Sequence, residues 1–367
     1  MQPWLTRAWG NASTREYALG WDAADAVEEA RSAISQLVGA ASGDLIFTSG
    51  ATESLATVIR GFVGYSDWHQ CKLVTCKTEH SAVLETCEQM RRLTQQVELC
   101  VLPVDHNGLC DLEDLRTNVL TEKRCLMAVM LANNEIGSIA HVESIGRIAR
   151  ATGAQFLCDA TQAVGKTPLE FERWQVDFVA FSAHKIYGPK GVGALAIRKG
   201  VELQPLIVGG GQEHGMRGGT LNVAAIVGFG EACRIAQKEM QSDNQQIVKL
   251  RDRLESTLVA ELPDIWVNGG GAERLCNTSN IGFRGIDART MIRDMHDVAC
   301  STKSACSSGD PGPSHVLKAI GLTDEEAYSC IRFSLGRFTT DQEIDHALEK
   351  IIGTVCKLTN GRSSGIV

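Results

Sequence analysis

The chain has 367 residues, of which 44% are hydrophobic and 22% are charged, and its formal net charge is -8. This composition is typical of a globular protein with enough apolar residues for two domains. Because the balance is acidic and no Lys/Arg-rich run occurs, direct binding to nucleic acid is not expected.

The opening stretch, MQPWLTRAWGNAS, has no apolar signal-peptide region, and no run of about eighteen apolar residues follows. The thirteen cysteines are scattered without a CxxC pair, as expected for free thiols in a reducing compartment. These features predict a cytoplasmic protein that has neither a membrane partner nor a metal site.

The first two thirds of the chain alternate between apolar strands and helices. A helix is predicted over 23–38 and is followed by the strand DLIFTSG. KLVTC at 72–76, a helix over 81–94, VELCVLP, a second helix and CLMAVMLA at 125–132 come next. A helix over 142–152 then precedes QFLCDA and VDFVAFSA. Continuous apolar strands separated by helices indicate an α/β fold with a mainly parallel sheet covered by helices.

The last third of the chain has a different pattern. A long helical pattern runs from about 222 to 261, with a polar interruption at 242–246, and leads to strands near 278–283 and 330–334. Helices are expected near 288–296 and 341–358. We therefore expect a large domain over 1–240 and a smaller α+β domain over 241–367.

Polar, chemically capable residues follow the apolar strands. Asp159 and Lys185 each follow a strand, and the carboxyl ends of parallel strands meet at one edge of a sheet. Pyridoxal phosphate needs such a pair, because a lysine holds its aldehyde and an acid keeps its ring nitrogen protonated. A surface lysine and a helix-capping aspartate would give the same spacing, so this pattern alone leaves both interpretations open.

The stretch SGATES at 49–54 could hold the phosphate of such a cofactor. Ser49, Gly50, Ala51 and Thr52 are small residues at a strand-to-helix turn. The free N–H groups and the dipole of a helix N-terminus favour an anion there. Small residues mark many such turns, so this signal gains weight only from its place upstream on the same predicted sheet.

Eight ordered segments resemble the cysteine desulfurases of the NifS/IscS branch, which are aminotransferase class V, pyridoxal-phosphate-dependent enzymes of fold type I. The matching segments are FTSGATES, KTEHSAVLETC, NNEIG, CDATQAVGK, FSAHKIYGPKGVGAL, GGGQEHGMRGGT, SACSSG and IRFSLGRFTT. The resemblance covers nearly the whole chain. It implies a fold type I large domain with a smaller C-terminal domain that carries a catalytic cysteine loop.

The resemblance also implies a role for each site residue. Lys185 is then the cofactor-holding lysine and Asp159 the acid at the ring nitrogen. His80 stacks on the ring and relays a proton, and Gln162 bonds the phenolic oxygen. Asn134 and Arg332 bind the substrate carboxylate. The phosphate ligands are the remaining set: Ala51, Thr52, Ser182, His184 and, from a neighbouring subunit, Thr220.

Cys306 is the predicted nucleophile. It lies in STKSACSSGDPGPSH, whose many Ser, Gly and Pro residues indicate a loop rather than a core. The resemblance implies that Cys306 takes sulfur from L-cysteine as a persulfide, leaves L-alanine and passes the sulfur to an acceptor protein. Iron-sulfur assembly, tRNA thiolation and DNA phosphorothioation are all open as destinations.

The resemblance further implies a homodimer, because the segment GGGQEHGMRGGT reaches the neighbouring subunit in the family. One departure concerns the N-terminus, where the usual first strand of the family is absent from this sequence. Either the start is misassigned or truncated, or the enzyme lacks this wall of the substrate pocket. A weakly active or non-catalytic scaffold of a sulfur-transfer complex is therefore an alternative. A related class V enzyme such as a selenocysteine lyase, or an aminotransferase, is another.

Overall fold

The computed structural model describes residues 1–41, 45–65, 70–303 and 312–363. The chain divides into two compact units. The first comprises 1–102, 111–132 and 140–240, and the second comprises 103–110, 133–139 and 241–367. Two short segments from the first half of the sequence thus belong to the second unit. The sequence pattern predicts both segments as part of the large domain.

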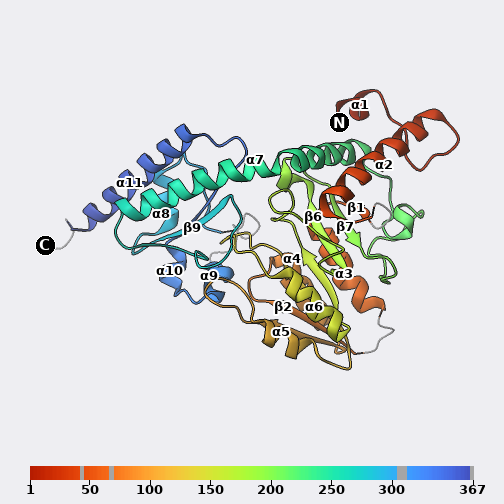
Figure 1. Ribbon diagram of the computed structural model, residues 1–367, viewed down its shortest axis with the longest axis horizontal. Helices are drawn as coiled ribbons and strands as arrows, with labels where there is room; N and C mark the ends of the chain where they lie inside the picture. The colour runs from red at the N-terminus through yellow and green to blue at the C-terminus, as the bar shows by residue number, and fades with distance from the viewer. Residues whose placement is uncertain (42–44, 66–69, 304–311, 364–367) are drawn as a thin grey trace. The chain divides into compact units, whose positions relative to one another are not determined.

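The first unit is built on a seven-stranded sheet in the order β1-β7-β6-β5-β4-β2-β3 (Figure 1). Its strands are β1 (Leu45–Thr48), β2 (Cys71–Cys76), β3 (Val97–Leu102), β4 (Arg124–Met130), β5 (Gln155–Asp159), β6 (Phe178–Ser182) and β7 (Gly193–Ile197). The five neighbouring strands β3, β2, β4, β5 and β6 pair in parallel. β7 runs antiparallel to both β6 and β1. The predicted α/β class with a mainly parallel sheet is confirmed.

The helices of this unit mostly alternate with the strands, as the sequence pattern predicts. They are α1 (Gln2–Thr6), α2 (Ala18–Val38), α3 (Ala51–Tyr65), α4 (Ser81–Leu93), α5 (Leu112–Val119) and α6 (Val142–Thr152), with short 3₁₀ turns η2 (Ala183–Ile186) and η3 (Glu213–Gly215). The helix α1, which was not predicted, precedes the first strand. The helix α2 ends where Gly39 adopts φ 68, a left-handed conformation that glycine favours. Every residue of β6 is buried, which explains its continuous apolar sequence.

One part of the core of the first unit lies between the sheet and the helix pair α3 and α4. Leu55, Ile59 and Phe62 of α3 pack with Leu73 of β2 and Phe178 of β6, and all five side chains are almost fully buried. Each such side chain contributes about 1.5–3 kcal/mol when it is removed from water. This packing fixes the strand ends, and therefore the residues that follow them, in a rigid frame.

The second unit has a three-stranded antiparallel sheet in the order β10-β9-β8. Its elements are β8 (Ile265–Val267), β9 (Thr278–Phe283), α8 (Ala288–Asp294), α9 (His315–Ala319), α10 (Asp324–Tyr328), β10 (Cys330–Ser334) and α11 (Asp341–Ser363). The helix α7 (Val223–Glu261) contains the boundary between the units and is continuous. The sequence pattern predicts a polar interruption at 242–246, but the helix continues through it. Polar side chains are tolerated on a solvent-facing helix surface.

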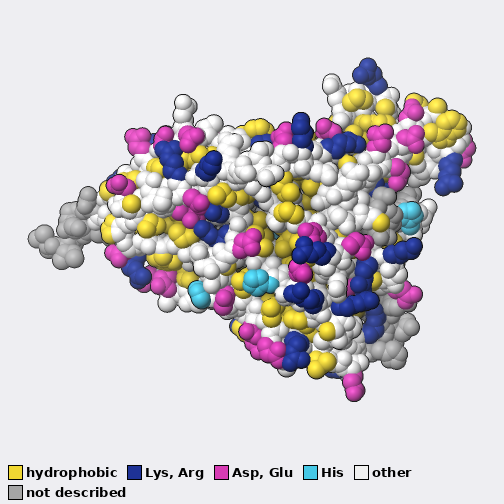
Figure 2. All heavy atoms as spheres, viewed as in Figure 1, with side chains coloured by type: hydrophobic (Ala, Val, Ile, Leu, Met, Phe, Trp, Pro, Cys, Tyr) yellow, Lys and Arg dark blue, Asp and Glu magenta, His cyan; other side chains and the backbone are white. Residues whose placement is uncertain are grey.

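The described surface is mixed in charge. Figure 2 shows both acidic and basic side chains across the visible face. Within the described residues, no helix combines the length and the apolar composition that crossing a bilayer requires, and no cluster of three or more His, Cys, Asp or Glu side chains could hold a metal ion.

Candidate active site

The register of the sheet places the predicted phosphate ligands at one edge. Thr48 of β1 and Ser182 of β6 both pair with Gly193 of β7, so β1 and β6 end at the same level on the two sides of β7. The hydroxyl oxygen of Ser182 accepts a hydrogen bond of 2.7 Å from the backbone N–H of Ala51, the first residue of α3. A strand end and a helix N-terminus therefore meet there, as expected for an anion site.

Two glycines allow this close approach. A Cβ atom on Gly193 would lie 2.6 Å from the Cα of Gly50, a distance that no real side chain tolerates, and Gly50 has φ 154. The turn before α3 can therefore lie directly against β7 because Gly193 lacks a side chain, and Gly50 provides a φ that residues with a side chain rarely adopt.

Asp159 ends β5 and is buried, with only 6% of its surface exposed. Its Oδ1 accepts a hydrogen bond of 2.9 Å from the backbone N–H of Thr161. Burial raises the pKa of the Asp159 carboxyl, and the hydrogen bonds from Thr161 and the charges of His80 and Lys185 counteract part of that increase. The first unit thus brings His80 and Lys185 within electrostatic range of one buried acid.

His80 begins the helix α4 as its N-cap residue. The ring Nδ1 accepts a hydrogen bond of 3.1 Å from the backbone N–H of Ala82. Because Nδ1 is an acceptor, the neutral ring carries its proton on Nε2. A helix cap therefore fixes both the position and the tautomer of this imidazole, which a stacking and proton-relay role would require.

Lys185 lies in the short turn η2 immediately after β6, next to His184, and both side chains are exposed. Tyr187 closes the turn with φ 65, a left-handed conformation that is uncommon for a bulky residue. Partial burial of the ring, together with the charges of Lys185 and Lys190, lowers the pKa of His184. His184 is therefore a neutral donor or acceptor at physiological pH.

Three further predicted cofactor ligands lie in the first unit. The structure describes no side-chain contact between them and the other predicted cofactor ligands. Gln162 follows β5, and its backbone oxygen accepts a hydrogen bond of 2.8 Å from Lys166. Thr52 is exposed in the first turn of α3, and Thr220 is exposed at the end of the glycine-rich segment. An exposed Thr220 is available to a second chain, but its role stays a prediction.

A buried ion pair that the sequence analysis did not identify anchors the glycine-rich segment. Arg31 of α2 contacts Glu213 through two hydrogen bonds of 2.8 and 2.9 Å, and Glu213 also accepts the backbone N–H of Phe47 at 2.7 Å. The exposed fractions of the Arg31 and Glu213 side chains are 4% and 1%. Removing one partner of such a buried pair typically costs about 3–5 kcal/mol, so this pair fixes the segment firmly to α2 and β1.

A second ion pair connects the same segment to the anion-binding turn. Arg217 contacts Glu53 of α3 at 3.0 Å, and Glu53 accepts the backbone N–H of Ser49 at 2.8 Å. No local sequence signal identifies either pair, because the partners are more than 160 residues apart in the chain. Both become visible only once the segment lies over β1 and α3.

Glu79 is another buried acid that sequence reasoning missed. Only 1% of it is exposed, and its Oε1 accepts the backbone N–H of Met130 at 2.7 Å. Glu79 directly precedes His80 and follows the end of β2 by three residues. This position after a strand and beside a predicted site residue could have identified it from the sequence. Its hydrogen bond ties the residue before His80 to β4.

The second unit carries the predicted substrate-binding pair. Arg332 lies in β10, and its Nη1 donates a hydrogen bond of 2.8 Å to the backbone oxygen of Asn134. The Nε of Arg332 is buried and has no hydrogen-bond partner among the described residues. Burial lowers the pKa of Arg332, and the charge of Glu135 counteracts this effect. A buried guanidinium with an unused N–H is a suitable binding group for a carboxylate.

Cys306 lies outside the described residues, within 304–311. The residue Ser301 shortly before that segment exchanges two backbone hydrogen bonds, of 2.7 and 3.1 Å, with Arg332. The chain that leads to Cys306 is thus attached to the strand that carries the predicted carboxylate ligand.

Several described cysteines are poor nucleophiles. Burial raises the pKa of the thiols of Cys87 and Cys125 to about 12 and that of Cys300 to about 11. Such thiols stay protonated at neutral pH, and the thiolate is the reactive form. Cys356 of α11 is the described cysteine that is exposed, which makes it a useful reference for Cys306.

Comparison with known proteins identifies the family. Residues 1–347 match the aminotransferase class-V family. The chain belongs to that family. It is 42% identical to a protein named cysteine desulfurase IscS from Rickettsia typhi, over 98% of this chain and 87% of the relative.

Two solved structures extend the similarity to three dimensions. A NifS-like protein is 32% identical with a TM-score of 0.88, over 97% of this chain and 94% of that one. A structure described as SspA in complex with cysteine is 30% identical with a TM-score of 0.80, over 92% and 94%. The family and the fold class predicted from the motifs are both confirmed.

Proposed function

We propose that this protein is a cysteine desulfurase, which converts L-cysteine to L-alanine and retains the sulfur as a persulfide on Cys306. The observation that carries the proposal is the buried Asp159 within electrostatic range of His80 and Lys185. It occurs in a chain 42% identical to a protein of that name. The sulfur would then pass to an acceptor protein.

The residues of the first unit fit pyridoxal phosphate. The helix N-terminus at Ala51, facing the hydroxyl of Ser182, suits the phosphate group. A protonated ring nitrogen would offset the cost of burying an ionised Asp159. When bound, pyridoxal phosphate supplies an electron-withdrawing ring that weakens the bonds at the substrate Cα.

The residues of this chain would perform the proton transfers. Asp159 would hold a proton at the ring nitrogen, and the Lys185 amine would bind the cofactor and later remove the proton from Cα of L-cysteine. His80, whose Nε2 carries the proton when the ring is neutral, would face the ring and relay a proton. Gln162, Thr52, His184 and, from a second chain, Thr220 are proposed as further cofactor ligands.

Sulfur transfer would use Cys306 as a thiolate. Its sulfur attacks the sulfur of L-cysteine, a new S–S bond forms and the C–S bond breaks. The electron pair of the broken bond returns to the carbon fragment, which takes up protons and leaves as L-alanine. The products are one L-alanine and one Cys306 persulfide for each L-cysteine.

The direct test is an assay of the purified protein with pyridoxal phosphate and L-cysteine. We expect equal amounts of L-alanine and protein-bound persulfide in a single turnover, and continued alanine formation when a thiol reductant releases the sulfur. Cofactor-loaded protein that forms no alanine would contradict the proposal and favour the scaffold alternative. Release of alanine from L-selenocysteine but not from L-cysteine would favour a selenocysteine lyase.

Arg332 provides a prediction about substrate affinity. We propose that it binds the substrate carboxylate with Asn134, using the Nε that has no partner among the described residues. Replacing Arg332 with lysine removes the planar two-pronged donor but keeps the positive charge. We expect kcat/KM for L-cysteine to fall by about 10-fold to 100-fold, as for loss of a charge-assisted hydrogen bond.

The matched control for Arg332→Lys is Arg253→Lys. Arg253 is an arginine of the second unit that pairs with Asp341 on the surface. The control should leave kcat/KM unchanged. Equal kinetic constants for Arg332→Lys and the wild type would remove Arg332 from the substrate site.

We propose that the protein acts as a homodimer in the cytoplasm. The described cysteines are free thiols, which suits a reducing compartment, and the anchored glycine-rich segment presents an exposed Thr220. The acceptor stays open between iron-sulfur assembly, tRNA thiolation and DNA phosphorothioation.

A further inference from the structure

A polar cavity of about 460 Å³ lies in the first unit and contains none of the proposed catalytic residues. It opens at the amino-terminal edge of the parallel strands. Arg124 and Gln155 begin β4 and β5, and Asp177 directly precedes β6. Asp159 ends β5 at the opposite edge, four residues from Gln155, which corresponds to about 13 Å along a strand. The cavity is therefore separate from the candidate active site.

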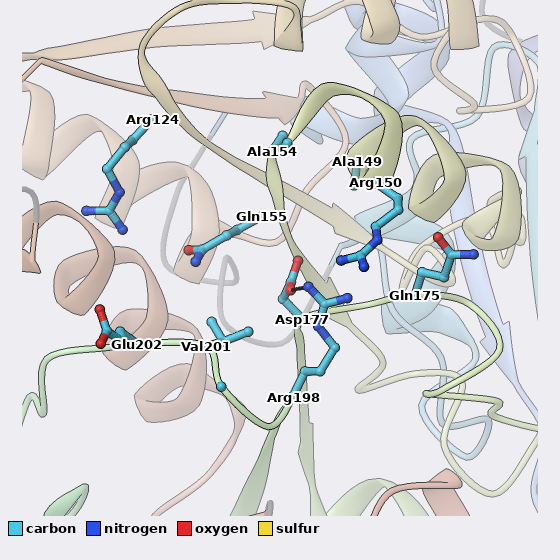
Figure 3. A pocket seen from close by; sticks show the side chains of 12 residues that line it. Arg124, Ala149, Arg150, Ala154, Gln155, Gln175, Asp177, Arg198, Val201 and Glu202 are labelled. Carbon is cyan, nitrogen blue, oxygen red and sulfur yellow. Dashed lines mark ion pairs between the residues drawn. The ribbon is translucent and has the colours of Figure 1, made fainter.

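Three arginines and two carboxylates line this cavity: Arg124, Arg150, Arg198, Asp177 and Glu202. Figure 3 shows Arg124 and Arg150 reaching in from opposite sides, with Gln155 between them. The count leaves one positive charge in excess. A cavity with an excess cation and several N–H donors favours a ligand with one negatively charged oxygen group.

Arg198 is already neutralised. It forms an ion pair with the buried Asp177, whose other carboxylate oxygen accepts the backbone N–H of Phe156 at 2.8 Å. The backbone N–H of Arg198 also bonds the Asp177 carbonyl at 2.8 Å. This pair forms a fixed wall of the cavity and is not available to a ligand.

Arg150 is the available cation. It lies in the last turn of α6, and its guanidinium makes neither a hydrogen bond nor an ion pair with another described residue. Its charge acts on Asp177 only at longer range. An arginine that lines a cavity without a direct partner can bind an oxyanion through two parallel N–H bonds.

Gln155 supplies a second, independent indication of a ligand. Its Oε1 is buried and has no hydrogen-bond partner among the described residues. Leaving a buried polar atom unsatisfied costs about 1–3 kcal/mol. A hydroxyl group satisfies either end of this amide, because it both donates and accepts a hydrogen bond.

We propose that this cavity binds a small metabolite that carries one oxyanion, held by Arg150, and a hydroxyl group, held by Gln155. Phosphate monoesters and hydroxy acids share this chemistry. The site requires no catalytic residue and would be occupied independently of L-cysteine.

Isothermal titration calorimetry on the intact, cofactor-loaded protein tests the proposal. The probes are glycerol 3-phosphate, a phosphate monoester, and L-lactate, a hydroxy acid with a single carboxylate. The probe that binds more tightly identifies the source of the oxyanion. We expect at least one probe to bind, and Arg150→Ala to weaken it about 10-fold or more. Gln155→Leu should also weaken binding, because it removes the hydroxyl partner while keeping all charges.

The control is Arg147→Ala, which removes the same charge from the same helix but outside the cavity, where Arg147 pairs with Glu143. It should bind the probe as the wild type does. Arg150→Glu, a second surface variant, should abolish binding. If neither probe bound at millimolar concentration, the site would be refuted. Equal binding by the wild type and Arg150→Ala would also refute it, since the probe would then be held elsewhere.

Discussion

Replacing Lys185 with alanine is expected to slow alanine formation from L-cysteine by at least about 100-fold, the lower range for loss of a positioned acid–base group. Lys185 lies directly after β6, within electrostatic range of the buried Asp159. No other proposed group of the first unit carries an amine. The variant should lose both the covalent hold on the cofactor and the base that removes the Cα proton.

Borohydride treatment followed by mass spectrometry separates these two losses from simple misfolding. The wild type should gain the mass of one reduced cofactor per chain, and Lys185→Ala should gain none while keeping its melting temperature. Lys199→Ala is the matched control, because Lys199 is an exposed lysine just after β7. A cofactor mass on Lys185→Ala would assign the covalent role to another lysine.

Replacing Cys306 with alanine is expected to abolish persulfide formation while leaving the cofactor bound. The C–S bond breaks when a thiolate takes the substrate sulfur, and the variant has no thiolate at position 306 to accept it. We expect alanine production to fall by at least about 1,000-fold, whereas the visible absorption of bound pyridoxal phosphate should stay unchanged. Alanine assays and spectra on the same preparation measure both effects.

Cys356→Ala is the control for the thiol. Cys356 is exposed on α11 and is not part of the proposed chemistry. This variant should retain full activity and should still be labelled on Cys306 by a thiol reagent. If Cys306→Ala kept wild-type alanine production, Cys306 would not be the sulfur acceptor, although the assignment of Lys185 would be unaffected.

The buried pair Arg31–Glu213 has a bearing on the proposed dimer. It fixes the middle of the glycine-rich segment, and Arg217 fixes the part nearer its end to Glu53. Glu53 also holds the backbone N–H of Ser49 in the anion-binding turn. A segment attached in this way can present Thr220 in one geometry, which lowers the entropy that a second chain must overcome on binding.

Much of the fold could be predicted from the sequence because the strands are short apolar runs and the helices between them are periodic. β4, β5 and β6 are buried along almost their whole length, and that burial requires the continuous apolar sequences seen at 125–132 and 176–183. The antiparallel pairing of β7 with β6 and β1 was not predicted. Strand direction depends on how the chain returns to the sheet, which residue composition does not encode.

The sequence by itself determined the residues that follow the strands, the family motifs and the family to which the chain belongs. Only the tertiary structure decided which groups act on one another. Asp159 with His80, Ser182 with Ala51, and Glu213 with Arg31 are examples. The sequence likewise could not predict the cavity around Arg150, because its lining comes from strand ends and loops spread over 124–202. Contacts across such separations follow from packing, and local patterns carry no record of them.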